Sequence, residues 1–251
     1  MSGHNKWSTI KHKKGAADAL RGKLFTKHAK LIAIAARNGE NPDTNALLKA
    51  AIANAKMDNV PSDNIKRAIA KGAGADKNAA SYQELNYEGY APSGIAIIIE
   101  TLTDNPNRTY TNVRNIMNKN GGTLGEMGSV AWMFKLKGSM EVVHSTSLNL
   151  EQLEMDLIEA GAEDFEHGSE STQIFTAFAD LGQVRDYLLS KNYQLENITK
   201  KQIPDNYQMI SDMDTANKIW NLIEKLEEDE DVSEIYHNAE FSDDLLKSLD
   251  E

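Results

Sequence analysis

The chain has 251 residues, a formal net charge of −11 at pH 7, 40% hydrophobic residues and no cysteine. The lack of cysteine excludes disulfide bonds, thiolate metal sites and a thiol nucleophile. It is typical of a reducing compartment, so we expect a cytoplasmic protein. The longest apolar runs, such as residues 95–99, are too short to span a bilayer, and the N-terminus lacks the apolar core of a signal peptide.

The N-terminal part reads as three short helices. Leu24, His28 and Leu31 begin an apolar helical face that ends at Asn38-Gly39. Asn41-Pro42 is typical of a helix N-cap followed by proline, and the second helix that it opens ends at Val60-Pro61. Ser62 can cap a third helix, which we expect Gly72 to close in the left-handed conformation. Together these segments predict a small helical bundle.

After residue 81 the pattern alternates between strands and helices. The β-branched residues 94–102 predict a buried strand, and residues 104–119 predict a helix. The segments that follow predict strands at 129–136 and 139–143, a helix at 150–161, a strand at 171–178, a helix at 181–192, strands at 194–203 and 206–210, a helix at 214–226 and a strand at 232–236.

The order of these elements predicts the fold. Residues 132–203 follow the ferredoxin-like split βαβ pattern, and the flanks 94–131 and 206–237 repeat strand, helix, strand. Because each flank alone would leave a sheet edge uncovered, we expect the flanks to form one domain with the other inserted in it. The predicted fold is therefore α+β, with an N-terminal three-helix bundle followed by two ferredoxin-like βαββαβ domains, one inserted in the other. The expected domains are residues 1–78, residues 79–131 plus 206–251, and residues 132–205.

Charge is distributed unevenly along the chain. Residues 1–72 hold 14 Lys and Arg against 5 Asp and Glu, a net charge of +9, whereas the other 179 residues carry −20. Residues 1–30 alone carry +7, while from Glu227 onward 11 acids accompany one lysine. This segregation favours a polyanionic partner for the N-terminal end. The acidic end is typical of a solvated face.

Motifs for catalysis are missing. The sequence contains no nucleophile elbow, no phosphate-binding P-loop and no His-Glu-x-x-His pair. His4, His12 and His28 are spaced by 8 and 16, which does not place two imidazoles on adjacent helix turns, so we predict no metal site. We expect His28 to pack within the bundle. The protein is predicted to be no enzyme and to use no cofactor or small-molecule substrate.

The candidate nucleic-acid contacts lie in the basic N-terminal segment. Lysines there can neutralise phosphates, and an aromatic side chain among them can stack on an unpaired base. An alternative is a solvated basic tail with the tryptophan docked on the bundle. The predicted binding residues are Lys6, Trp7, Lys11, His12, Lys13, Lys14, Arg21, Lys23 and Lys27.

A glycine series after the helix at 104–119 is a second candidate site. It follows a helix and precedes a strand, which is the reverse of a dinucleotide-binding fingerprint. These glycines can simply cap the helix and form a loop, or they can let the backbone approach a bulky partner. We expect Arg108 in the loop or first helical turn, where it could reach a phosphate or a carbonyl. The residues of this second contact are Arg108, Arg114, Lys119, Gly122 and Gly125.

Four stretches closely resemble the YebC family, also called the YebC/PmpR family. They are SGHNKWSTIKHKKGAADALRGKLFTK, VPSDNIKRAIAKGAG, YEGYAPSGIAIIIETLTDNPNRT and NKNGGTLGEMGSVAWMF. The resemblance implies a helical domain and two α+β domains, one interrupted by the other. The family is widely labelled as probable DNA-binding transcriptional regulators. It also includes a mitochondrial translational activator and bacterial members tied to ribosomes that slow on proline-rich nascent chains. It implies no enzyme activity and no cofactor.

These observations predict a non-catalytic regulator of gene expression. Its expected target is ribosomal RNA, because the densest charge precedes any clear helix and a tryptophan suits splayed RNA bases better than a B-form groove. The expected role is a translation factor that helps synthesis through proline-rich stretches. The alternative is a DNA-binding transcriptional regulator, since phosphate attraction is not sequence-specific. We expect a monomer that does not associate with membranes.

Overall fold

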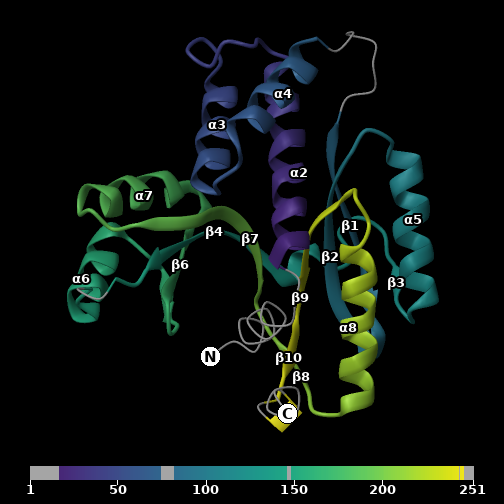
Figure 1. The fold of residues 1–251 in the computed structure, drawn as a ribbon. Coiled ribbons are helices and arrows are strands. Elements are labelled where there is room, and N and C mark those ends of the chain that lie inside the picture. The colour runs from purple at the N-terminus through teal and green to yellow at the C-terminus, as the bar shows by residue number, and fades with distance from the viewer. Residues whose placement is uncertain (1–16, 75–81, 146–147, 243, 246–251) are drawn as a thin grey trace. The chain divides into compact units, whose positions relative to one another are not determined.

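The structure is a computed structural model that describes residues 17–74, 82–145, 148–242 and 244–245. The fold is α+β, with a helical N-terminal part followed by two four-stranded sheets (Figure 1). The chain divides into two compact units, one formed by the residues up to Met133 and from Pro204 onward, the other by Phe134–Ile203. The helical residues 17–74 belong to the first unit in this division, so their separation as a domain ending at residue 78 stays a prediction.

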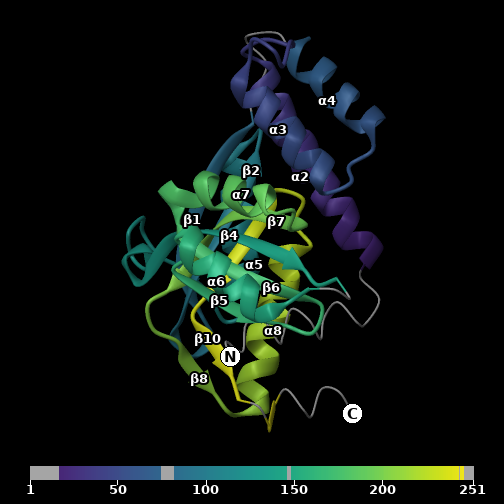
Figure 2. The same cartoon turned by 90° about the vertical axis from the view of Figure 1, so that its left-hand side faces the viewer.

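Three helices form the N-terminal bundle: α2 (Ala17–Ala36), α3 (Ala46–Met57) and α4 (Ser62–Ala73). Figures 1 and 2 show α2 running alongside both of the others. Apolar positions at helical spacing meet between them, as the sequence predicts. The buried core of the bundle consists of Ile32, Ala35, Ala36, Leu48, Ala55, Val60, Ile65 and Ala68.

Three local predictions in the bundle are wrong. Ser62 does not cap the third helix but is its first residue, after Pro61 at the N-cap position. The second helix is capped by Asn45, whose side chain accepts a hydrogen bond from the Leu48 amide, and the Asn41-Pro42 pair lies in a preceding turn. Asn45 also donates to the carbonyls of Ala35 and Gly39, which ties the start of α3 to the end of α2. Gly72 does not close α4 but lies within it.

Gly72 is buried where α4 crosses α2. A Cβ atom on Gly72 would lie 2.2 Å from the carbonyl oxygen of Ala33, a distance that no side chain can occupy. Gly72 therefore serves close helix packing and not a left-handed turn.

The sheet of the first unit has the order β3-β1-β2-β9. Its strands are β1 (Gln83–Ala91), β2 (Ile95–Thr103), β3 (Thr123–Leu124) and β9 (Val232–His237), and all neighbours are antiparallel. The turn between β1 and β2 includes a 3₁₀ segment, Pro92–Gly94. Strand β1 is absent from the sequence prediction, because its residues carry two acids and a glycine and do not alternate cleanly.

The predicted strand at 206–210 has a different place. It forms β8 (Gln208–Ile210), which pairs in parallel with β10 (Ala239–Phe241) in a separate two-stranded sheet. Strand β1 therefore takes the position in the four-stranded sheet that the prediction left for a strand after the insertion. The sheet therefore keeps the strand order of a ferredoxin-like domain, but one of its strands, β1, precedes the other elements in the chain.

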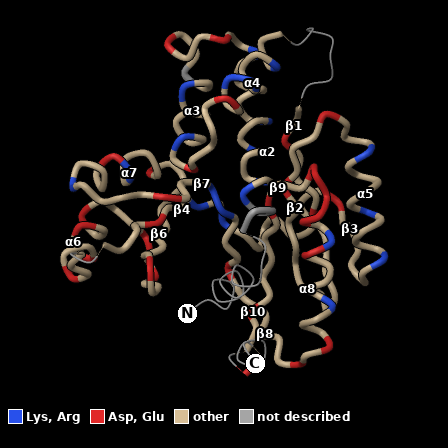
Figure 3. Tube along the Cα trace, in the orientation of Figure 1, with Lys and Arg blue, Asp and Glu red and all other residues tan. Residues whose placement is uncertain are grey.

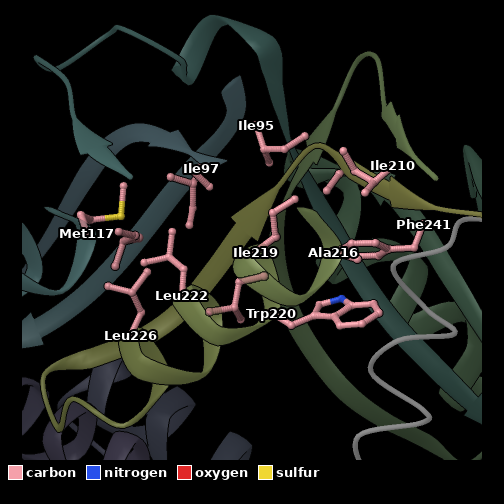
Figure 4. Packing of buried hydrophobic residues seen from close by; sticks show 14 of the residues in the cluster. Ile95, Ile97, Met117, Ile210, Ala216, Ile219, Trp220, Leu222, Leu226 and Phe241 are labelled. Atoms are coloured by element: carbon pink, nitrogen blue, oxygen red, sulfur yellow. The ribbon is translucent and has the colours of Figure 1, made fainter. Parts of the chain in front are cut away.

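Two helices, α5 (Pro106–Lys119) and α8 (Met213–Glu227), cover one face of this sheet. Alternate residues of β2 meet them: Ile95, Ile97 and Ile99 are fully buried in one cluster with Met117 and Leu222 (Figure 4). Strand β2 is buried along its whole length, as its β-branched sequence predicts.

The second unit is a complete βαββαβ domain. Its strands are β4 (Phe134–Val143), β5 (Asp164–His167), β6 (Ser171–Ala177) and β7 (Leu195–Pro204), in the ferredoxin-like order β5-β6-β4-β7. Its helices are α6 (Leu150–Ala160), ended by the left-handed Gly161, and α7 (Leu181–Ser190), which follows the 3₁₀ turn Phe178–Asp180. The two strands predicted at 129–136 and 139–143 form one strand, β4, after a 3₁₀ turn at Ala131–Met133.

Among the helices that the structure describes, none combines the length and the apolar character required to cross a bilayer.

A pair of glycine substitutions tests the α2–α4 contact. Gly72→Ala should lower the free energy of unfolding by about 1 to 3 kcal/mol, because the added methyl group overlaps the Ala33 carbonyl. Gly22→Ala is the matched control, since Gly22 lies in α2 with nothing within 4 Å of its Cβ position. That change should raise stability by about 0.5 to 1 kcal/mol through helix propensity. Urea denaturation measures both, and equal effects would contradict the close contact.

Candidate nucleic-acid interface

Helix α2 carries the predicted basic residues that the structure describes. Arg21 is exposed, whereas Lys23 and Lys27 are half-buried. The other predicted contacts, Lys6, Trp7, Lys11, His12, Lys13 and Lys14, lie outside the described residues.

His28 lies on the buried face of α2, as predicted. Its Nε2 contacts a carboxylate oxygen of Asp58, the residue that follows α3. His28 therefore ties the first two helices together and is not available to a ligand.

Two lysines of α2 are used inside the protein. The Lys27 ammonium pairs with Glu234 on β9 at 2.8 Å. The Lys30 ammonium, one turn further on, donates to the carbonyls of Leu102 (2.9 Å) and Glu230 (2.8 Å) and lies 3.3 Å from Asp231. These contacts fasten α2 to the sheet, so charge that looks free in the sequence is already neutralised.

Asp231 is the centre of this contact. Its carboxylate is buried and accepts a 2.7 Å hydrogen bond from Arg108, while the hydroxyls of Thr103 and Thr109 lie 3.2 and 2.8 Å from the same oxygen. Burial alone would raise the pKa of Asp231, but the hydrogen bonds from Arg108 and Thr109 and the charge of Lys30 outweigh it and hold that pKa below its usual value. The group stays ionised and joins four segments of the first unit.

Arg108 lies in the first turn of α5, the position that the sequence predicts. Its guanidinium pairs with Asp104 (3.1 Å) as well as with Asp231. In the structure the partners of the arginine fork are therefore carboxylates of the chain itself. Arg114 and Lys119 lie further along α5 and are exposed.

The glycine loop is packed against its own chain. A Cβ on Gly122 would meet the Tyr90 carbonyl and two core side chains at 3.1 to 3.2 Å, and one on Gly125 would lie 2.4 Å from the Ser129 hydroxyl. Gly121 and Gly128 have positive φ angles of 77° and 86°. The loop conformation therefore requires glycine at all four positions, for close contacts at Gly122 and Gly125 and for positive φ angles at Gly121 and Gly128.

Glu88 on β1 holds the loop in place, a role that no local motif indicates. Its carboxylate accepts hydrogen bonds of 2.8 to 2.9 Å from the amides of Gly128, Val130 and Ala131. Burial alone would raise the pKa of Glu88, but these three amides outweigh it and keep the pKa below its ordinary value. An isolated acid in a strand cannot be recognised as a loop clamp until the loop is placed beside it.

The clamped loop presents exposed side chains that sequence analysis also missed. Met127 is 91% and Trp132 73% exposed. The Trp132 indole and the Tyr90 hydroxyl both donate to the Ser129 carbonyl, at 3.1 and 3.2 Å. The sequence predicts Trp132 in a strand at 129–136, whereas it lies in the 3₁₀ turn Ala131–Met133.

Charge is arranged in patches on the first unit. In Figure 3, blue positions recur on α3, α4 and α5, and red positions gather beside the label β9. Within the described ranges, no group of three or more His, Asp or Glu side chains is placed to hold a metal ion.

Comparison with known proteins identifies relatives over almost the whole length. Residues 5–75 match the family model described as "TACO1/YebC protein N-terminal domain", and residues 82–239 match "TACO1/YebC second and third domain".

A protein of Hathewaya histolytica, named a probable transcriptional regulatory protein, is 48% identical over 242 residues, covering 96% of this chain and 98% of the relative. One of Dictyoglomus thermophilum with the same description is 44% identical over 250 residues, covering 99% and 100%. The crystal structure of a conserved hypothetical protein from Aquifex aeolicus is similar with a TM-score of 0.80 and 40% identity, covering 90% of this chain and 93% of that one.

Asp231→Asn tests the central ion pair. The substitution removes the charge that Lys30 and Arg108 share and should lower the free energy of unfolding by about 3 kcal/mol, because breaking a buried ion pair leaves a charge uncompensated. Amide exchange in α2 should speed up most. Glu230→Gln is the control, as its side chain is exposed and next in sequence. Equal unfolding midpoints for the two variants would contradict this role of Asp231.

Glu88→Gln tests the loop clamp. The amide cannot accept all three hydrogen bonds, so stability at pH 7 should fall by about 2 kcal/mol. Because the folded pKa of Glu88 is lowered, its contribution is present above the ordinary value of 4.5 and is lost as the pH falls further. Urea titrations from pH 7 to pH 3 should therefore show the gap between wild type and Glu88→Gln closing only below about pH 4.5. Glu126→Gln, in the exposed part of the loop, should leave the curve unchanged.

Proposed function

The chain belongs to the TACO1/YebC family, and we propose that it is a non-catalytic regulator of gene expression that binds nucleic acid through its basic N-terminal segment. The observation that carries the proposal is the net charge of +7 on residues 1–30 in a chain of net charge −11. Lysine-rich segments bind phosphates with the release of counterions, independently of sequence. The names of the relatives from Hathewaya histolytica and Dictyoglomus thermophilum agree with a regulatory role.

The internal ion pairs narrow down which charges serve binding. Lys27 and Lys30 are occupied by Glu234 and Asp231, so a phosphate would have to displace a carboxylate to reach them. Arg21 is exposed on the first part of α2. We therefore assign phosphate binding to Arg21 together with the segment before α2, which contributes Lys6, Lys11, Lys13 and Lys14.

The proposed target is ribosomal RNA. A basic segment that contains Trp7 can neutralise phosphates and stack an aromatic ring on an unpaired base, which suits RNA. Duplex readers instead place a preformed helix in the major groove. The exposed faces of α3 and α4 do carry Lys49, Lys56 and Lys66, but these lysines are spread over two helices. On this basis we propose a translation factor that helps synthesis through proline-rich stretches.

A DNA-binding transcriptional regulator is the second candidate. The relatives' names favour it, and basic side chains bind the phosphates of DNA and RNA alike. The two candidates differ in what they must discriminate: base edges in a groove for DNA, or shape and unpaired bases for RNA.

Deleting residues 1–16 should abolish nucleic-acid binding while leaving the fold intact, because α2 begins at Ala17. If about six phosphates are neutralised, the affinity of the full chain should fall about a thousandfold between 50 and 200 mM salt. Fluorescence anisotropy of a labelled RNA hairpin measures both. The matched variants are Lys11→Gln, Lys13→Gln and Lys14→Gln together, against Lys49→Gln, Lys56→Gln and Lys66→Gln together.

The three substitutions in the N-terminal segment should weaken the salt dependence of RNA affinity, and the three substitutions on α3 and α4 should not. A larger effect of the substitutions on α3 and α4 would assign binding to the exposed faces of these helices. Competition at one fixed salt concentration between ribosomes, the RNA hairpin and a promoter duplex separates the two candidate functions. Preferential displacement by the duplex would overturn the ribosomal assignment and leave nucleic-acid binding in place.

A further inference from the structure

A hollow on the first unit lies where the C-terminal end of α5 meets the N-terminal half of α8. It encloses about 550 Å³ and is lined in part by Lys119, Asn120, Lys218 and Asn221. A hydrogen bond of 3.1 Å from Asn221 to Asn120 joins the two helices there. The volume is in the range of small-molecule sites and is large enough for a nucleotide unit.

The third wall of the hollow is the turn between β1 and β2. Ser93 in this turn has a left-handed backbone, with φ of 62°, which is uncommon for a residue other than glycine. Gln208 fixes the turn by donating to the Ser93 carbonyl at 3.0 Å. Pro92 lies close to Gly121, which follows the end of α5 and has a positive φ of 77°. The walls are thus held by specific contacts.

The charge of the lining is positive. Lys119 and Lys218 are exposed, and within the described residues neither ammonium group forms an ion pair or a hydrogen bond, while Lys218 interacts with Asp212 through charge alone. This contrasts with Lys27, Lys30 and Lys225, which all pair with acids. Among the described residues that line the hollow, none carries a carboxylate, although Asp212 lies near Lys218. Two cations without an ion pair in one concave site favour an anion there.

The backbone adds to this preference. The hollow is lined by Thr215 in the first turn of α8, where the amide dipoles favour an anion and the carboxylates of Asp212 and Asp214 already offset part of this effect. Asp212 caps this helix: its carboxylate accepts from the Thr215 amide, which lowers its pKa. Lys218 also acts on Asp212 electrostatically but forms no ion pair with it.

We infer that this hollow binds a phosphate group through Lys119 and Lys218, as a second contact for the nucleic acid that the N-terminal segment holds. The inference rests on the proposed function for the identity of the ligand, since a free nucleotide or pyrophosphate carries the same chemistry. A basic segment alone gives attraction without orientation. A second phosphate site on a rigid wall fixes the direction in which the strand crosses the molecule.

The test compares Lys119→Gln/Lys218→Gln with the matched control Lys137→Gln/Lys225→Gln, whose lysines pair with Glu163 and Glu228. All variants are made in the full chain, and their unfolding midpoints are checked. Anisotropy with the RNA hairpin between 50 and 200 mM salt should show the slope of log affinity against log salt falling by about 1.4 to 1.8 in the first variant only, as expected for the loss of two phosphates. Equal slopes in the first variant and in wild type count against a nucleic-acid contact here.

Pyrophosphate distinguishes the source of the phosphate. Titrated into the labelled protein, it should shift the amide resonances of Asn120 and Gly121, and the first variant should lose this shift. Such a shift together with unchanged RNA slopes would assign the site to a free phosphate compound. No shift together with unchanged slopes would overturn the inference. Deletion of residues 1–16 tests the N-terminal segment independently. If the deletion leaves RNA binding intact, the proposed role of this segment is wrong, and the lysine variants still test the hollow.

Discussion

The first unit depends on one buried carboxylate. Asp231 meets Lys30 from α2, Arg108 and Thr109 from α5, and Thr103 at the end of β2, while its own segment leads from α8 into β9. Two cations and two hydroxyls satisfy a charge that would be costly to bury alone. The helical bundle is therefore fastened to the sheet by a polar contact at a defined position.

This contact changes the meaning of the charge segregation. In sequence, +9 on residues 1–72 and −20 on the rest suggest two electrostatically separate parts. In the structure, part of the positive charge of α2 is matched by Glu234 and Asp231 from the acidic part. The same split therefore supports both assembly of the chain and attraction to a polyanion. Net charge counts cannot separate these two uses, whereas distances between ammonium and carboxylate groups can.

Elements with a regular apolar period could be predicted from the sequence. The helices α2, α5, α6 and α8, the strand β2 and the βαββαβ order of the second unit all follow from local patterns. Strand β1 could not, because its partners β2 and β3 supply the order that its own sequence lacks.

The role of Gly72 could not be predicted either, because a glycine near a helix end can serve as a cap or allow two helices to cross closely. The position of the Ala33 carbonyl shows that it allows a close crossing.

The candidate site was predictable in composition and not in geometry. The sequence predicts Arg108 in the loop or first turn of its helix, and it lies in the first turn of α5, but its carboxylate partners lie 4 residues before it and 123 residues after it. The second of these has no local signal. Glu88 likewise acts on a loop some 40 residues away. Residue types indicate which side chains could bind a ligand. Tertiary contacts decide which of these side chains are already bound to other groups of the protein.

The lysines that remain unpaired are the informative ones. A strongly acidic protein repels nucleic acid over most of its surface, so attraction is confined to places where cations lack carboxylate neighbours. On the described part of the first unit, Lys119 and Lys218 form no ion pair, although Asp212 lies near Lys218, and Arg21 on α2 is exposed. The acidic side chains on the rest of the surface then disfavour nucleic-acid binding in other orientations. An excess of acid in such a protein is compatible with nucleic-acid binding because it makes that binding directional.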